Sequence, residues 1–207
     1  MGKYSWMTRV IDSKTLFPDA PRGYRNNNPL NIRFSERNAW QGILGRDKEK
    51  GGMCVFSAQR YGIRAAFRLF ETYQKKYNKC SVREMISKWA PKKENNTEAY
   101  IKRVCEYMKC EPEFIPHFGA AAEMYDCIRM VKAMCEVENG APHNKYITDH
   151  DFETGWRLAF PYTSQFIQAE PDLNVGFDDL EEEEFVGIRI FFDYDEICKN
   201  TSFNGTL

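Results

Sequence analysis

The segment Arg25-Asn26-Asn27-Asn28-Pro29-Leu30-Asn31-Ile32-Arg33 places four asparagines in nine residues. Asparagine is a poor former of helices and strands and favours turns in which its amide bonds to nearby backbone. Pro29 fixes its own φ angle and pushes Asn28 toward an extended conformation. The segment therefore predicts an ordered loop that enters a short extended piece, Leu30 to Phe34. Its amides suit recognition of sugar hydroxyl and acetamido groups, and a purely structural turn fits equally well.

Helical periodicity dominates the chain beyond this loop. Turn signals continue to about Phe56, and apolar residues then recur at steps of three and four from about Ala58 to Tyr77. Further amphipathic patterns predict helices at about residues 81–90, 96–108, 120–138 and 148–160. Two of these starts have capping-box spacing, with an acidic residue three positions after a hydroxyl residue. They are Ser81 with Glu84 and Thr148 with Asp151.

These patterns predict a mainly α fold of the α+β type, with about five or more helices and a small loop and β region near the N-terminus. The 207 residues, 43% of them hydrophobic and 14% aromatic, suffice to bury a full core. We expect an N-terminal arm over residues 1–20, one domain over residues 21–165 and an acidic tail over residues 166–207. Within the tail, Phe185 to Phe192 has the composition of a β-strand.

The charge of the chain is divided unevenly along its length. Residues 168–207 hold 11 acidic and 2 basic residues, whereas residues 1–167 hold 19 acidic and 27 basic ones. The body is therefore basic and the tail acidic. A basic body suits nucleic acid, an anionic cell envelope or its own acidic tail. Nucleic acid is not expected as a partner, because the positive charge is spread over several helices instead of one motif.

The sequence also indicates which cofactors and targeting segments are not expected. No stretch approaches the roughly 18 apolar residues of a membrane span, and Met1 to Asp19 has no apolar run of signal-peptide length. The seven cysteines form no CxxC pair and have no histidine at ligand spacing, so neither a disulfide framework nor a zinc site is indicated. No nucleotide-binding glycine motif is present. We expect synthesis in the cytoplasm without a signal peptide, no membrane span, no metal and no cofactor.

One carboxylate near the end of a predicted helix stands out. The apolar stripe of this helix advances in steps of four, three and four through Met124, Ile128, Val131 and Cys135. A further step of three gives Glu138 on the same side, while Glu136 is rotated by about 100° toward solvent. The segment Asn139-Gly140-Ala141-Pro142 then stops the helix. Partial burial and the negative end of the helix dipole favour a protonated carboxyl group, as a general acid requires. A helix-end carboxylate that faces water is the alternative.

Several separate motifs resemble a family of phage virion-associated muralytic proteins of the lysozyme-like, lytic transglycosylase type. They occur in the same order and with similar spacing over roughly residues 21 to 160. These motifs are Pro21 to Arg33, Trp40-Gln41-Gly42, Tyr61 to Ala65, Lys88-Trp89-Ala90-Pro91, Glu94 to Tyr100, and Met130 to Gly140. In lysozyme-like transglycosylases generally, the helix that ends in the catalytic Glu precedes the Asn-rich loop. The reverse order here implies a circular permutation that keeps one cleft.

The resemblance implies roles for individual residues. Glu138 would be the catalytic acid. Four asparagines would line the saccharide groove or hold its loop, and these are Asn26, Asn27, Asn28 and Asn31. Aromatic rings stack well on the apolar faces of sugars, and the candidates for this role are Tyr24, Trp40 and Tyr61. Trp89 is expected in the core, because it closes a helix before Pro91.

The number of carboxylates decides the expected chemistry. Glycoside hydrolases usually need a second carboxylate about 5 to 9 Å from the first. Five residues are possible partners, although each fits an ordinary loop or cap position: Glu36, Asp47, Asp149, Asp151 and Glu153. A single acid/base Glu fits lytic transglycosylation, in which the 6-hydroxyl of the sugar attacks, and it could also serve a lysozyme that activates water.

Two functions are therefore carried forward. The first is cleavage of peptidoglycan glycan strands by a phage-encoded or virion-associated enzyme that is delivered to the bacterial cell wall. The second is a non-catalytic virion or envelope-binding module with the same fold. In either case virion proteins are candidate partners for the C-terminal tail.

Overall fold

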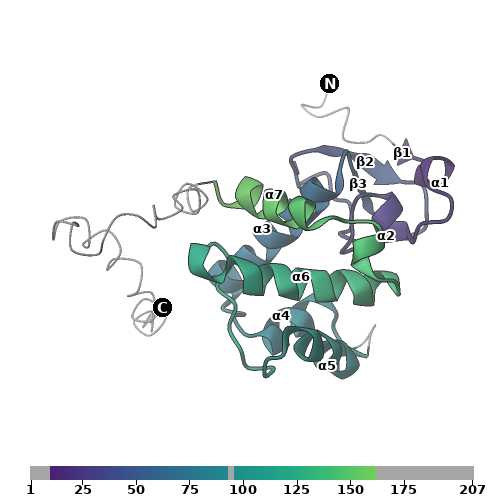
Figure 1. The fold of residues 1–207 in the computed structure, drawn as a ribbon. Coiled ribbons are helices and arrows are strands. Elements are labelled where there is room, and N and C mark those ends of the chain that lie inside the picture. The colour runs from purple at the N-terminus through teal and green to yellow at the C-terminus, as the bar shows by residue number, and fades with distance from the viewer. Residues whose placement is uncertain (1–9, 93–95, 162–207) are drawn as a thin grey trace, which may run out of the picture. The chain divides into compact units, whose positions relative to one another are not determined.

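The computed structural model describes residues 10–92 and 96–161, which are arranged around the helix α6, Met124–Asn139 (Figure 1). The other elements are β1 (Val10–Ile11), α1 (Ser13–Leu16), α2 (Arg22–Arg25), β2 (Ile43–Asp47), β3 (Cys54–Phe56), α3 (Gln59–Tyr77), α4 (Val82–Trp89), α5 (Thr97–Met108), η2 (Ala121–Glu123), η3 (His143–Lys145) and α7 (Asp149–Ala159). The predicted mainly helical fold with a small β region is confirmed. The strand predicted at Phe185 to Phe192 lies outside the described residues.

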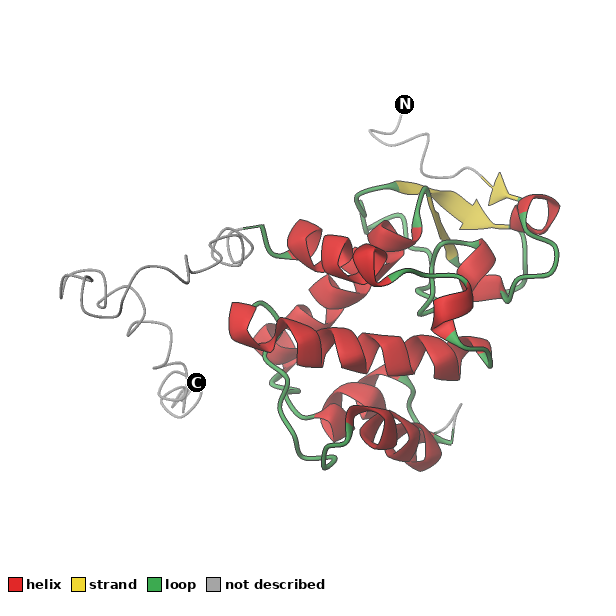
Figure 2. Ribbon diagram, viewed as in Figure 1, coloured by secondary structure: helices red, strands yellow, loops and turns green. Residues whose placement is uncertain are grey.

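The strands form one small sheet in the order β1-β2-β3. β1 runs parallel to β2, with Val10 opposite Arg46, and β2 pairs antiparallel with β3, with Arg46 opposite Cys54. Residues 10–20, which the sequence assigned to an arm, therefore contribute an edge strand and the helix α1. The extended piece expected at Leu30 to Phe34 makes only an isolated bridge, between Arg33 and Met53. In the view of Figure 2 the sheet lies above the half of α6 that leads to its C-terminal end, beside α1 and α2.

Local sequence signals set the helix boundaries. Ser81 and Glu84 form the predicted capping box at the start of α4, and Thr148 and Asp151 form one at the start of α7. The Asn96 side chain caps α5 by accepting from the Ala99 amide. The helix predicted from residue 120 begins as the 3-10 turn η2 before α6 proper. All five predicted helices are therefore present, and the short helices α1 and α2 are additions to them.

The core is formed where α6 packs between other helices. α4 and α5 lie on one side of α6 and α7 on the other (Figure 1). An aromatic cluster from α3, α7 and their connections fills the interior, with Phe67 edge-on to Trp156 and Phe70 stacked on Phe118. These large buried surfaces supply most of the driving force for folding. In the part of the chain that the structure describes, no helix is long and apolar enough to cross a membrane.

Candidate functional site

Glu138 lies in the last turn of α6, where two other helices direct donor groups at its carboxylate. Trp89 Nε1, at the end of α4, donates to Oε1 at 2.9 Å. The Tyr100 hydroxyl, from α5, donates to the same oxygen at 3.0 Å. Glu138 is partly buried, and its carboxylate faces α4 and α5, on the side of α6 that carries the apolar stripe. Glu138 is thus a fixed, hydrogen-bonded carboxylate at a helix end.

The Asn-rich loop meets this helix end although the two lie far apart in the chain. Asn31 Nδ2 lies 3.3 Å from Glu138 Oε2 and 3.2 Å from the Glu138 carbonyl oxygen, across a separation of 107 residues. Asn139 Nδ2 donates in the other direction, to the Pro29 carbonyl at 2.7 Å and to the Cys135 carbonyl at 2.8 Å. The loop and the end of α6 are therefore joined from both sides.

Two loop asparagines are fully buried and bind neighbouring groups of the loop and the sheet. Asn26 Nδ2 donates to Asp47 Oδ2 at 2.7 Å, and its Oδ1 accepts from the Ser13 hydroxyl. Asn28 donates to the carbonyls of Ile32 and Cys54 and accepts from the Ile32 amide. Both residues have no exposed surface. Of the two roles considered for them, these contacts match the holding of the loop.

The other two asparagines adopt the left-handed conformation. Asn27 has φ 51° and Asn31 has φ 51°, a region that asparagine tolerates better than most residues. Asn27 Nδ2 donates to the Phe56 carbonyl at 3.0 Å, so this amide also braces the loop against β3. Only Asn31 of the four asparagines directs its amide at Glu138.

Two glycines allow the loop to come this close. A Cβ atom at Gly23 would lie 2.3 Å from Asn139 Oδ1, and one at Gly62 would lie 2.2 Å from the Asn27 carbonyl oxygen. Neither distance is compatible with a side chain. α2 therefore contacts the end of α6, and α3 contacts the loop, at positions where only glycine fits.

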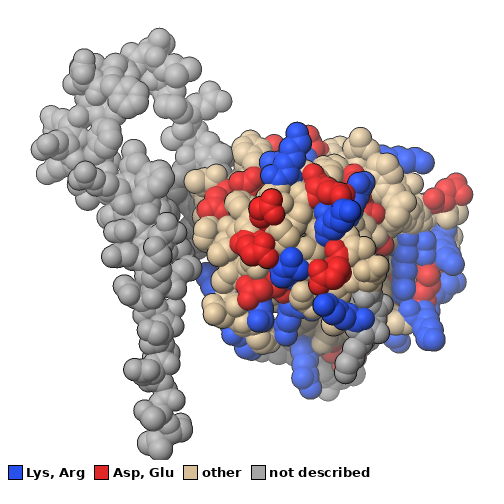
Figure 3. Space-filling view, turned by 90° about the horizontal axis from the view of Figure 1, so that it is seen from below, with Lys and Arg blue, Asp and Glu red and all other residues tan. Residues whose placement is uncertain are grey.

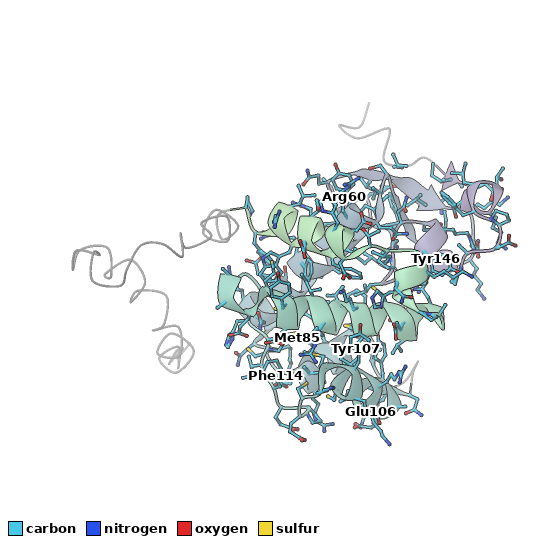
Figure 4. The ribbon with its side chains drawn as sticks, viewed as in Figure 1. Arg60, Met85, Glu106, Tyr107, Phe114 and Tyr146 are labelled. Carbon is cyan, nitrogen blue, oxygen red and sulfur yellow. The ribbon has the colours of Figure 1, made fainter. Side chains whose placement is uncertain are left out.

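The three aromatic candidates lie in different surroundings. Tyr24 is 2% exposed, and its hydroxyl donates to the carbonyls of Ala141 at 2.9 Å and Cys135 at 3.1 Å. Its ring stacks on Tyr146, which Figure 4 labels near α2. Trp40 and Tyr61 are partly buried against the core, and the Tyr61 ring covers Gly42. The structure thus shows Tyr24 holding the end of α6, and it leaves parts of Trp40 and Tyr61 accessible.

Sequence reasoning missed the two donors to Glu138 Oε1. Trp89 does pack against the core, with its ring 5.4 Å from that of Phe70, as its place before Pro91 predicted. Tyr100 is 7% exposed and lies within the amphipathic pattern of residues 96–108. A signal was available, because a buried Trp N–H or Tyr O–H needs a partner. The pattern alone did not say which residue supplies it.

Burial and charge alter the Tyr100 hydroxyl. Burial raises the pKa of Tyr100 well above its ordinary value, and the neighbouring Glu138 carboxylate raises it further. Tyr100 therefore remains a neutral donor throughout the physiological range. The same causes act on Tyr24, whose pKa is raised by burial and then by nearby acidic groups.

Four of the five possible second carboxylates have other partners. Asp47 is buried and bound to Arg22 and Asn26, which makes it part of the sheet region. Asp149 pairs with Lys132 at 2.6 Å, Asp151 caps α7, and Glu153 lies 4.0 Å from Arg157 in its own helix. Glu36 is exposed in the loop before β2. None of the five is hydrogen-bonded to Glu138 in the described part of the chain.

Glu136 differs from the sequence prediction. It was expected on a solvated surface, but its side chain is 20% exposed and its Oε1 lies 2.9 Å from Nδ1 of the buried His143. It borders a hollow of about 350 Å³ beside the end of α6, which is lined by Arg103, Glu136, Val137, Gly140, Ala141 and Pro142. The two carboxylates of this helix end thus have separate partners.

The surface and the composition of the site give two further observations. Lys and Arg lie among Asp and Glu over much of the face in Figure 3, so that face shows no uniform basic patch. Within residues 10–92 and 96–161, no group of three His, Cys, Asp or Glu side chains could hold a metal ion.

Comparison with known proteins gives one informative result. The chain is 34% identical over 149 residues to protein P5 of Pseudoalteromonas phage PM2, and the match covers 70% of this chain and 86% of that protein. No protein-family model matches the chain.

Proposed function

The chain belongs to the family of protein P5 of Pseudoalteromonas phage PM2, and from this premise we propose that it is a phage or phage-derived protein that cleaves the glycan strands of peptidoglycan. Glu138 is the acid and base of this reaction. The protein acts at the bacterial cell wall, and virion association would deliver it there. Peptidoglycan is the substrate and no cofactor takes part.

One observation carries the proposal. A carboxylate at the end of a helix is held by Trp89 and Tyr100, and it faces Asn31 of a loop that lies 107 residues earlier in the sequence. An ordinary surface carboxylate needs no such partners, since water can satisfy it. A carboxyl group fixed in position beside polar loop groups is what proton transfer to a glycosidic oxygen requires.

The resemblance to lysozyme-like transglycosylases supplies the steps of the reaction. Glu138 gives its proton to the glycosidic oxygen as the bond from that oxygen to the anomeric carbon breaks. The 6-hydroxyl of the same sugar then attacks the anomeric carbon, and its proton returns to Glu138. An anhydro sugar forms and Glu138 is regenerated. A single acid/base Glu is sufficient for this route, and the second carboxylate of a hydrolase is not needed.

The loop has two roles in the proposal. Asn26, Asn27 and Asn28 hold its shape, and Asn31 lies beside the acid. Trp40 and Tyr61 retain accessible ring surface and are the aromatic candidates for sugar stacking. The contact between Asn31 and Glu138 also supports a circular permutation, because it unites the loop and the catalytic helix in spite of their reversed order in the chain.

Zymography on purified murein tests the proposal. The wild-type protein should clear the gel, Glu138→Gln should not, and Glu136→Gln should clear like the wild type. Glu136 is a matched control, because it lies in the same helix turn and binds His143 instead of the Trp89 and Tyr100 pair. Clearing by Glu138→Gln would refute the assignment of the acid. No clearing by the wild type would favour the non-catalytic binding module.

Mass analysis of the products separates the two chemistries. Transglycosylation leaves anhydro-muropeptides, whereas hydrolysis adds water to the new end. We expect anhydro products from the wild type. Products with a free reducing end would show that Glu138 activates water instead.

A further inference from the structure

The two oxygens of the Glu138 carboxylate have unequal surroundings. Oε1 accepts two hydrogen bonds, from Trp89 Nε1 at 2.9 Å and from the Tyr100 hydroxyl at 3.0 Å. Within the described part of the chain, Oε2 accepts a hydrogen bond only from Asn31 Nδ2, at the longer distance of 3.3 Å. A difference of this kind determines where a proton can be held.

An indole N–H can only donate a hydrogen bond, so Oε1 must remain an acceptor for Trp89. Oε1 already accepts from both Trp89 and Tyr100, so a proton on Oε1 would have to displace the Trp89 N–H or turn the Tyr100 hydroxyl from donor to acceptor, whereas a proton on Oε2 disturbs neither bond. An amide side chain can either donate or accept. Asn31 Nδ2 faces Oε2, and Asn31 Oδ1 is buried without a hydrogen-bond partner, so turning the amide over would let Oδ1 accept from a protonated Oε2.

From this geometry we propose that Oε2 carries the proton that Glu138 transfers, and that Trp89 and Tyr100 are positioning residues that keep Oε1 as the unprotonated, anchored oxygen. The inference rests on the proposed function for its use in catalysis. The asymmetry of the carboxylate itself does not depend on that function.

The supporting contacts fix the two donors before any substrate binds. The Trp89 ring packs on Phe70, with centroids 5.4 Å apart, and Tyr100 is 7% exposed. The Thr97 hydroxyl donates to the Ala90 carbonyl at 2.6 Å, which ties the end of α4 to the start of α5. When Oε2 loses its proton, the charge that appears on the carboxylate therefore meets donors that are already in place. Preorganised donors of this kind stabilise charge without rearrangement.

Nuclear magnetic resonance on the full chain tests the asymmetry without any activity measurement. The indole N–H signal of Trp89 is identified by its loss in Trp89→Phe. It should stay at the downfield position of a hydrogen-bonded indole while the pH is lowered through the protonation of Glu138. A move to the position of a free indole during that protonation would show the proton on Oε1 and would overturn the proposal.

Tyr100 gives a second readout. Because Glu138 contributes to its raised pKa, Glu138→Gln should let the Tyr100 hydroxyl ionise at a lower pH than in the wild type. Labelling of the tyrosine ring carbons would follow this ionisation. The signal of Tyr107, labelled in Figure 4 between α5 and α6, should not change by a comparable amount. An unchanged Tyr100 signal would contradict the contact.

The positioning role has its own activity test on solubilised glycan strands. Tyr100→Phe should lower kcat by about tenfold or more, since hydrogen bonds to charged groups are strong, and should leave KM nearly unchanged. The control Tyr107→Phe removes a hydroxyl from the same helix and should retain wild-type kcat. Equal kcat in Tyr100→Phe and the wild type would refute the positioning role. An inactive wild type would refute the proposed function alone, because the resonance experiments still decide the asymmetry.

Discussion

At the scale of single residues, Asp47 shows how a buried charge organises the loop. It accepts from Arg22 at 2.7 Å and 2.9 Å, from the Met53 amide at 2.9 Å and from Asn26 at 2.7 Å. Burial raises the pKa of this carboxyl, but the hydrogen bonds from Arg22, Met53 and Asn26 outweigh it and keep the pKa below its ordinary value. The ionised form of Asp47 therefore stabilises the fold.

The lowered pKa of Asp47 predicts that the free energy of unfolding depends on pH in the acid range. A group with a depressed native pKa contributes stability above its unfolded pKa of about 3.9, and the contribution disappears as the pH falls through the native value. Asp47→Asn should lower the free energy of unfolding by about 3 kcal/mol at pH 7, because it removes the charge that accepts both Arg22 hydrogen bonds and leaves Arg22 only the longer pair with Glu49, at 3.8 Å. The difference should shrink steadily below about pH 4.

Urea unfolding of the wild type and Asp47→Asn at a series of pH values measures this difference. Asp149→Asn is the control, since Asp149 is exposed in its pair with Lys132 and its loss should change stability by less than about 1 kcal/mol. A constant difference between wild type and Asp47→Asn from pH 7 to pH 2 would contradict the role given to the Asp47 charge.

Single residues also show which features of the site the sequence could predict. The apolar stripe placed Glu138 on the correct side of its helix, because helical periodicity is a local property. Trp89 was predicted in the core, and both Trp89 and Tyr100 do pack there. Their second role depends on the distance between α4, α5 and α6, which no local pattern contains. The same limit explains why the partner of Glu136 was missed.

At the scale of elements, α3 and the loop meet at Gly62. The helix itself would gain about 1 kcal/mol from Ala at this position. The new Cβ, however, would lie 2.2 Å from the Asn27 carbonyl oxygen, which belongs to backbone and cannot turn away. Gly62→Ala should therefore lower the free energy of unfolding by about 1–3 kcal/mol.

Gly155→Ala is the matched comparison, because it also adds a methyl group to a glycine inside a helix. Its nearest contacts would be the Ile63 side chain at 2.8 Å and the Arg60 carbonyl oxygen at 3.1 Å, both less close than the 2.2 Å contact at Gly62. Denaturant unfolding should show the smaller loss for Gly155→Ala. A Gly62→Ala protein as stable as the wild type would mean that the loop does not pack on α3 as described.

Helix boundaries were the most predictable part of the elements. Caps such as Ser81 with Glu84 are formed by neighbouring residues, so spacing in the sequence specifies them. The two-residue strand β1 and the four-residue helices α1 and α2 carry too few residues for periodicity. Their structure depends on partners elsewhere, such as Arg46 for Val10 and Asn26 for Ser13.

At the scale of the whole described molecule, α6 is central, whereas β1 and α1 are peripheral. Eight residues of α6 are buried, whereas Val10 in the edge strand β1 is 51% exposed and Leu16 in α1 is 66% exposed. Amides in densely packed elements exchange mainly through global unfolding, and those in weakly packed elements open locally. Hydrogen exchange should therefore be slowest in α6 and fast in β1 and α1.

Mass spectrometry of exchanged peptides measures this order. The wild type and Asp47→Asn should show the same ranking, with a further loss of protection around β2 in the variant, because Asp47 ends that strand. Exchange in α6 as fast as in β1 would contradict the central place of this helix.

The pair of Gly23 and Asn139 has a consequence for recognising relatives. The amide of Asn139 occupies the space that a side chain at position 23 would need, since Oδ1 lies 2.3 Å from the position of a Cβ there. These two positions, which are more than a hundred residues apart in the sequence, are therefore expected to vary together. A relative with alanine at position 23 has to shift the Asn139 side chain or replace it, and either change alters the hydrogen bond to the Pro29 carbonyl. Paired substitution at the two positions is thus a fingerprint that distant members can be searched for.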